Sequence, residues 1–69
     1  MTKGEYKVGI NFNPSGDDTV SKIKRAAADL IDLIETLPTE VVECIRLKSL
    51  AQTAIEEGAM WAVKAATKA

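Results

Sequence analysis

The sequence predicts an all-α protein: an antiparallel two-helix hairpin with an extended N-terminal arm, which assembles into a compact helical homo-oligomer. Two long segments carry apolar residues at helical spacing, and a short break containing Pro38 separates them. The chain has 69 residues, one cysteine and no histidine. A chain this short is marginally stable without a disulfide, a metal or a partner. Because one cysteine cannot form an internal disulfide and zinc ligands are lacking, oligomerisation is the expected stabiliser.

Residues 1–16 are expected to form an arm and a turn. Apolar residues alternate here with polar residues or glycine: Tyr6, Val8, Ile10 and Phe12. This period of two is typical of extended chain. Since one strand cannot form a sheet, we expect an extended arm, disordered in part or laid against another subunit. Pro14 restricts Asn13 to extended geometry, and the next two residues, 15–16, indicate a turn.

The first helix is expected over residues 17–37, with Asp17 or Asp18 as its N-cap. Its apolar residues follow a strict heptad spacing: Val20, Ile23, Ala27, Leu30, Ile34 and Leu37. Neighbouring apolar residues widen this stripe beyond what one partner helix covers, which favours a bundle. Three cations, Lys22, Lys24 and Arg25, lie in the first turns, where the helix dipole disfavours positive charge. They indicate either a function or an accidental, solvated distribution.

The second helix is expected over residues 39–68, capped by Thr39, and the short loop predicts that it returns antiparallel to the first. Its heptad positions are Leu47, Ala51, Ala54, Gly58, Trp61 and Ala65. A second apolar stripe faces elsewhere: Val41, Ile45, Ile55, Met60 and Val63. Two stripes need more partners than one hairpin supplies, so we infer self-association. We expect Trp61 in the core, Gly58 at a tight helix contact and Cys44 as a small buried hydrophobe.

No catalytic residues, metal ligands or cofactor are expected. Histidine is absent and Cys44 has no base partner in the sequence, which excludes the serine and cysteine triads that use histidine. The sequence contains no glycine-rich phosphate loop, and its paired carboxylates lack metal-site or glycosidase spacing. The net charge of −1 argues against DNA as a partner. No stretch approaches a membrane span or a signal peptide, so we expect an intracellular binding protein.

The segment from Phe12 to Asp18 and the helix it starts form the candidate binding site. An aromatic face, free backbone N–H groups at a helix N-terminus and nearby cations suit a nucleotide, whose base stacks and whose phosphate is negative. In the alternative interpretation, Phe12 is a hydrophobic plug, the aspartates are ordinary caps and the lysines form a solvated face.

Several motifs resemble one small phage family: Phe12-Asn13-Pro14-Ser15-Gly16, Ile23-Lys24, Ala28-Asp29-Leu30-Ile31-Asp32, Arg46-Leu47-Lys48 and Glu56-Glu57-Gly58-Ala59-Met60-Trp61-Ala62-Val63-Lys64-Ala65-Ala66-Thr67. The family is that of the anti-CBASS cyclic-nucleotide sponges, whose helical-hairpin domain is shared with anti-Thoeris sponges. The resemblance covers residues 11–68, and the run from Met60 to Thr67 is its most specific part.

The resemblance implies a helical homohexamer without enzymatic activity, which sequesters cyclic oligonucleotides in the cytoplasm of the infected bacterial host. By position, Phe12 would stack on a base of a cyclic dinucleotide, Asn13 and Ser15 would form hydrogen bonds, and Lys24 would meet a phosphate. Phe12 stands where the family often has tyrosine. The weaker candidates for a separate cyclic-trinucleotide site are Arg46, Gly58 and Thr67.

Other functions remain open from the sequence. A sponge for cyclic ADP-ribose isomers, on the anti-Thoeris side of the same domain, is one alternative. The absence of an evident strand-rich region weakly favours oligonucleotides over that ligand. Another alternative is a structural or protein-binding helical hairpin without a small ligand, for which replacing Phe12 or Lys24 would change only stability.

Overall fold

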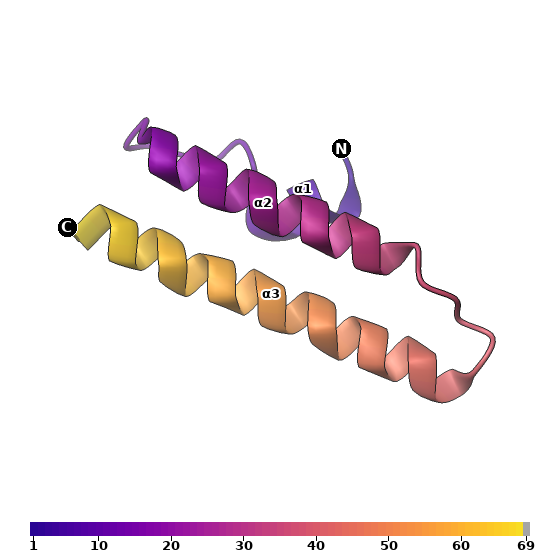
Figure 1. Cartoon of the computed structure of the whole chain (residues 1–69). Helices are drawn as coiled ribbons and strands as arrows, with labels where there is room; N and C mark the ends of the chain where they lie inside the picture. Colours follow the sequence, from indigo (N-terminus) through magenta and orange to yellow (C-terminus); the bar gives the residue numbers. More distant parts are fainter. Residues whose placement is uncertain (69) are drawn as a thin grey trace.

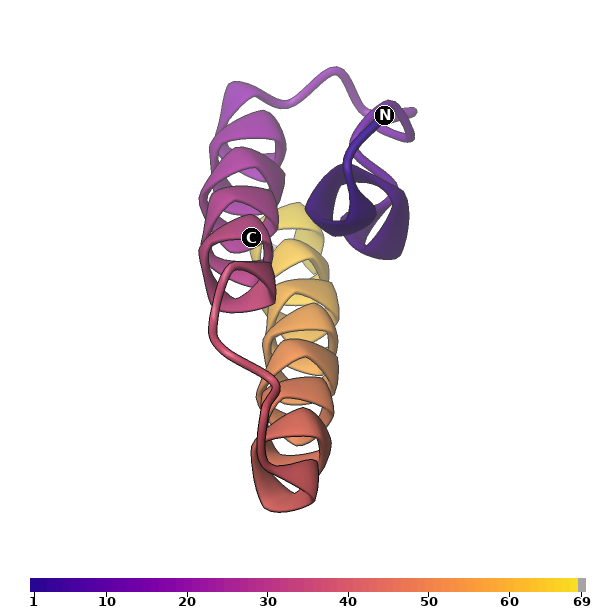
Figure 2. The ribbon, with the colours of Figure 1, turned by 90° about the vertical axis from the view of Figure 1, so that its right-hand side faces the viewer.

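Residues 1–68 of the computed structural model are described, and they form three helices: α1 (Lys3–Val8), α2 (Asp18–Glu35) and α3 (Val42–Lys68). The long helices α2 and α3 run antiparallel and side by side (Figure 1). The short helix α1 packs beside this pair, mainly along the part of α2 from Arg25 to Glu35 (Figure 2). Residues 1–68 contain no strand. The predicted all-α helical hairpin is therefore confirmed.

The N-terminal segment is a helix, so the expectation of an extended arm was wrong. Thr2 caps α1: its Oγ1 accepts a hydrogen bond from Glu5 N (3.1 Å), and Glu5 Oε1 accepts one from Thr2 N (2.8 Å). This reciprocal pair is a capping box. Gly9 ends the helix in the left-handed region at φ 63°. The period-two pattern would need a partner strand to form a sheet, and residues 1–68 contain none. The capping box and the packing on α2 therefore favour a helix over an extended chain.

A close approach at Gly4 joins α1 to α2. Gly4 N donates a 2.7 Å hydrogen bond to Asp32 Oδ1, which supplies an acceptor to the first turn of α1. A Cβ atom at Gly4 would lie 2.1 Å from the backbone oxygen of Ala28. Only glycine fits at this contact, and its backbone is buried there.

The long helices are shorter than the sequence suggested. Asp17 is the N-cap of α2, with Oδ1 accepting from Thr19 N at 2.8 Å, and α2 ends at Glu35 rather than at residue 37. The loop then runs over residues 36–41, and α3 begins at Val42. Thr39 therefore lies in the loop and does not cap the second helix.

The core uses different faces of the helices from those expected. The buried residues of α2 are Val20, Lys24, Ala28 and Ile31, so only Val20 of the predicted heptad positions is fully enclosed. On α3 the buried residues are Gln52 and Ala59, seven positions apart. The difference arises because α1 also covers α2, which moves the enclosed stripe toward Ala28. The spacing of apolar residues in α2 and α3 could not show that α1 also packs on α2.

Most of the predicted heptad face of α3 points outward, since Ala51 alone of its six positions is half-buried. Trp61 is 55% exposed, with its indole Nε1 3.4 Å from Glu57 Oε1 and the Lys64 ammonium 5.6 Å from its ring. The assignment of Trp61 to the core of this chain was therefore wrong. A Cβ at Gly58 would meet nothing within 4 Å, so no tight contact explains that glycine within residues 1–68. Cys44 is exposed rather than buried.

Across residues 1–68, none of the helices α1, α2 and α3 has both the length and the apolar character that crossing a bilayer requires.

Candidate ligand-binding site

The turn that follows α1 is tied to α2 by Lys24. Phe12 N donates to Gly9 O at 2.9 Å, which closes the turn on itself. The Lys24 ammonium donates to Gly9 O at 3.0 Å and also to Phe12 O. Lys24 is only 7% exposed, so its charge is enclosed by the carbonyl dipoles of this turn. Its side chain therefore fixes the position of residues 9–12 over α2.

The Phe12 ring is displayed on the outside of this turn. It is 72% exposed, and its centroid lies 5.5 Å from the Lys24 ammonium. At that distance the cation and the ring face attract one another. The turn therefore presents an open aromatic surface directly beside a positive charge.

Asn13 and Ser15 build the entry to α2. Asn13 Nδ2 donates to Asp17 O at 2.9 Å and to Ser21 Oγ at 3.0 Å. Ser15 Oγ donates to Asn13 Oδ1 at 2.9 Å and accepts from Asp17 N at 3.3 Å. In the free chain these hydrogen bonds fix the backbone that follows Phe12. Lys24 fixes the backbone from Gly9 to Phe12, so the turn is held on both sides of Phe12 in the sequence.

The three cations at the start of α2 have separate partners. Arg25 forms ion pairs with Glu5 and Asp29, both at 2.9 Å, and Lys22 pairs with Asp18 at 3.1 Å. The backbone N–H of Thr2 and then Arg25 lower the pKa of Glu5, whereas the hydrogen bond to Glu5 raises the pKa of Arg25. Arg25 thus links α2 to α1, and of the three cations Lys24 is the one that contacts the Phe12 turn.

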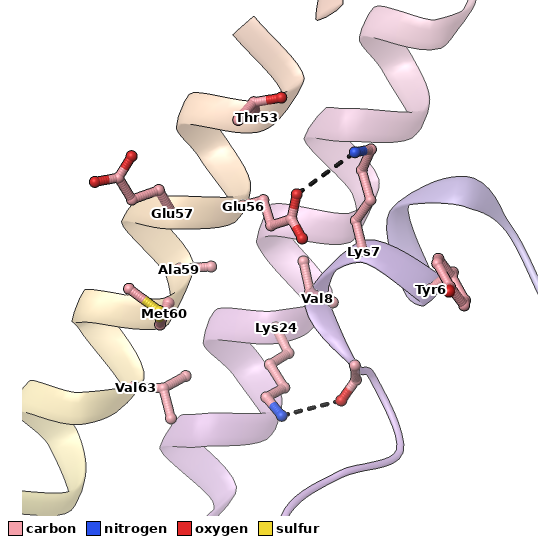
Figure 3. A pocket seen from close by; sticks show the side chains of 11 residues that line it. Tyr6, Lys7, Val8, Lys24, Thr53, Glu56, Glu57, Ala59, Met60 and Val63 are labelled. Atoms are coloured by element: carbon pink, nitrogen blue, oxygen red, sulfur yellow. Dashed lines mark hydrogen bonds and ion pairs between the residues drawn. The ribbon is translucent and has the colours of Figure 1, made fainter. Parts of the chain in front are cut away.

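A mostly apolar cleft of about 540 Å³ lies beside the turn, between α1 and α3 (Figure 3). It is lined by Tyr6, Lys7, Val8, Gly9, Lys24, Thr53, Glu56, Glu57, Ala59, Met60 and Val63. Lys7 reaches across one end to Glu56 at 3.5 Å. The cleft therefore has an apolar wall from α3 and the Lys24 ammonium near the turn.

A second hollow of about 360 Å³ lies at the other end of the hairpin, near the 36–41 loop. Its lining is almost wholly apolar: Ile34, Leu37, Pro38, Cys44, Leu47, Lys48 and Ala51. The candidate site residues named from the sequence do not line it.

The three residues expected at a trinucleotide site lie far apart on α3. Arg46 pairs with Glu43 at 2.9 Å near the start of the helix, and Thr67 Oγ1 donates to Val63 O at 3.0 Å near its end. Gly58 lies between them. At ~1.5 Å per residue, Arg46 and Thr67 are about 30 Å apart along the axis. One chain does not bring these residues together, whereas it does bring together Phe12, Asn13, Ser15 and Lys24.

In the part of the chain that the structure describes, no three histidine, cysteine, aspartate or glutamate residues are grouped as metal ligands.

Comparison with known protein families identifies the hairpin. Residues 5–67 match the family model described as Acb2/Tad1, hairpin domain. The chain belongs to this family. No curated protein and no solved structure matches the chain significantly.

The Acb2/Tad1 family is that of the anti-CBASS and anti-Thoeris sponges. Its members bind cyclic-nucleotide immune signals rather than cleave them. Family membership therefore implies that this hairpin domain is a cyclic-nucleotide sponge with an anti-defence role.

The sequence reasoning missed Gly4 and Gln52, which join the helices of the Acb2/Tad1 hairpin to one another. The Thr2-to-Glu5 spacing matches a capping box and could have revealed α1, and with it Gly4 inside a helix. Gln52 had no such signal, because a glutamine on a helix is ordinarily exposed. Its burial follows only from the way the three helices meet.

Proposed function

We propose that this chain is a phage protein that captures cyclic oligonucleotide immune signals in the cytoplasm of the infected bacterium. It holds them intact, so that the CBASS effector is not activated. Cyclic dinucleotides bind at the Phe12 turn. The observation that carries this proposal is the exposed Phe12 ring 5.5 Å from the Lys24 ammonium, in a chain of a sponge family.

The turn offers the chemistry that a nucleotide needs. A base stacks on the open face of Phe12, which is sequence-tolerant because every base has a π-face. Lys24 has three N–H donors, and the described residues accept from two of them, which leaves one for a phosphate oxygen. Asn13 and Ser15 lie on the same turn and exchange part of their internal hydrogen bonds for bonds to the ligand.

Self-association supplies the second half of the site. Leu47, Ala54 and Trp61, spaced by seven residues, form an apolar stripe on the outside of α3, and Leu47 and Trp61 are each about half exposed. An apolar stripe of this kind favours contact with another copy. A two-fold interface provides two copies of Phe12 and Lys24, one for each half of a cyclic dinucleotide. We propose a homohexamer, as the resemblance implies.

Cyclic trinucleotides occupy separate sites in this proposal. Because Arg46, Gly58 and Thr67 are spread along α3, such a site takes different residues from different copies around a symmetry axis. Thr67 bonds only to its own helix, and Arg46 holds only an exposed ion pair among the described residues, so both can be recruited at little cost.

Isothermal titration calorimetry against a panel tests the proposal. The panel contains cyclic dinucleotides, cyclic trinucleotides and cyclic ADP-ribose isomers, with linear dinucleotides as controls. Ligand recovered after heat release is then identified by chromatography. Tight binding of a cyclic oligonucleotide recovered intact supports the proposal. Tight binding of cyclic ADP-ribose isomers alone favours an anti-Thoeris sponge, cleaved ligand indicates an enzyme, and no binding leaves a structural or protein-binding hairpin.

A further inference from the structure

We infer that Gly4 and Asp32 are positioning residues for ligand capture: their contact docks α1 on α2 and thereby holds the Phe12 turn in its binding shape. This inference rests on the proposed function, because it concerns the same turn. Neither residue touches the turn, so both act through the backbone of α1.

The contact is close and directional. Gly4 is buried, its N–H donates to Asp32 Oδ1 at 2.7 Å, and its Cα faces the backbone of Ala28, which is fully buried. The Asp32 carboxylate meets the positive end of the α1 backbone, where a negative charge is favoured. A methyl group at Gly4 would lie 2.1 Å from Ala28 O, and a backbone atom cannot rotate away from it. Even alanine would therefore displace α1 from α2.

The other links between α1 and its neighbours run through longer side chains. Lys3 bonds Glu35 and Gln52, both at 3.0 Å. Arg25 bonds Glu5 at 2.9 Å, and the side chains of both ion pairs are partly exposed. Exposed ion pairs contribute little because water screens them. The Gly4 contact is therefore the link that sets how closely α1 lies on α2.

A displacement of α1 reaches Phe12 through a short and constrained path. Only four residues lie between Gly4 and Gly9, and they belong to one hydrogen-bonded helical segment. Gly9 O is one of the two oxygens that Lys24 holds, and it also accepts from Phe12 N. When α1 moves, Gly9 moves with it, so the Lys24 bond and the closure of the turn are lost together. Phe12 then samples several positions instead of one.

The test compares two disruptive variants with two matched controls. Gly4→Ala introduces the clash, and Asp32→Ala removes the acceptor without adding bulk. Asp32→Asn keeps an acceptor oxygen at the same place. Glu40→Ala is the matched control for the loss of a carboxylate, because Glu40 is an exposed residue of the 36–41 loop. For each variant we would measure affinity for the cyclic dinucleotide that the wild type binds best, mass by light scattering, and amide hydrogen exchange in residues 3–12.

If the turn keeps its binding shape only about a tenth of the time, affinity falls about tenfold. We expect this loss in Gly4→Ala and Asp32→Ala, with faster exchange in residues 3–12 and unchanged assembly mass. Asp32→Asn and Glu40→Ala should bind like the wild type. Should Gly4→Ala fail to fold, Asp32→Ala carries the test.

Other outcomes overturn the inference. If Asp32→Ala binds with wild-type affinity, that result by itself overturns the inference. A loss of affinity accompanied by a smaller assembly also overturns it, because the variant then acts on oligomerisation. Loss in Asp32→Asn equal to that in Asp32→Ala also overturns it, because the acceptor oxygen would then not matter. Absence of binding by the wild type instead overturns the proposed function, and this inference with it.

Discussion

The side-chain amide of Gln52 donates a 3.0 Å hydrogen bond to the carboxylate of Glu35, and so joins α3 to α2 where α1 also arrives. The Lys3 ammonium lies 3.0 Å from both the Glu35 carboxylate and the Gln52 carbonyl oxygen. The hydrogen bond from Gln52, followed by that from Lys3, lowers the pKa of Glu35 from 4.5 to about 2. One carboxylate thus connects all three helices.

This connection predicts a loss of stability in acid. Because the folded state lowers the pKa of Glu35, its charge stabilises the fold fully above pH 4.5, and this contribution is lost as the pH falls toward 2. We would measure the melting temperature of the wild type and of Glu35→Gln from pH 7 to pH 2. The wild type should be the more stable above pH 4.5, and the difference should close near pH 2.

Glu35→Gln is a suitable reference because glutamine resembles the protonated glutamate. The pKa of Glu5 is also lowered, but that residue is the same in both proteins, so its effect cancels in the comparison. A difference in melting temperature that stays constant from pH 7 to pH 2 would show that Glu35 is not the group whose charge matters.

Gln52→Ala should destabilise the protein by about 1–3 kcal/mol, the scale of a buried polar group left without its partner. Gln52 is 1% exposed, and its amide also donates to Ile31 O at 3.1 Å. Urea unfolding at one fixed protein concentration measures this cost, with the exposed neighbour Thr53→Ala as control. The control should stay within about 0.5 kcal/mol of the wild type. Equal effects of both variants would contradict a central role for Gln52.

The helical hairpin could be predicted from the sequence because its helices and the break between them depend on residues close together in the chain. Apolar spacing, Asp17 as a cap and Pro38 as a break each act within a few residues. The same reasoning brought Phe12 and Lys24 together as candidates, because both lie near one helix start. The structure places them 5.5 Å apart.

The choice of buried face could not be predicted in this way. The placement of Ala28 and Gln52 in the core depends on α1, which contacts α2 through a glycine that has no side chain to signal it. Trp61 is the clearest consequence. A large apolar residue at a heptad position looks the same whether it faces the partner helix or the outside.

Because Trp61 lies outside the core of the chain, replacing it should affect assembly more than folding. Trp61→Glu places a charge in the exposed apolar stripe and should shift the protein toward smaller species. Trp61→Phe keeps that surface apolar and should preserve the assembly. Light scattering after size-exclusion chromatography measures the mass, and circular dichroism checks that both variants stay helical. Unchanged mass in Trp61→Glu would remove this face from the interface.

Lys24→Met tests the role of the buried ammonium. Methionine keeps the length of the side chain but leaves Gly9 O and Phe12 O without their donor. Affinity for a cyclic dinucleotide should fall by about 1.5–3 kcal/mol, the scale of a hydrogen bond to a charged group. Lys22→Met is the matched control, because Lys22 is on the same helix and holds only an exposed ion pair, so its loss should be below about 0.5 kcal/mol. Calorimetry that finds equal affinities for the two variants would exclude Lys24 from the site.

Phe12→Ala distinguishes a stacking surface from a hydrophobic plug. A stacked base contributes about 1–3 kcal/mol, so calorimetry should show a loss of affinity on that scale. Because Phe12 is 72% exposed, the melting temperature should barely change, whereas removing a plug would lower it. Phe12→Tyr keeps the ring and should bind like the wild type, and Tyr6→Ala controls for removing another exposed aromatic residue. A lower melting temperature with unchanged affinity would mean that the ring serves the fold rather than the ligand.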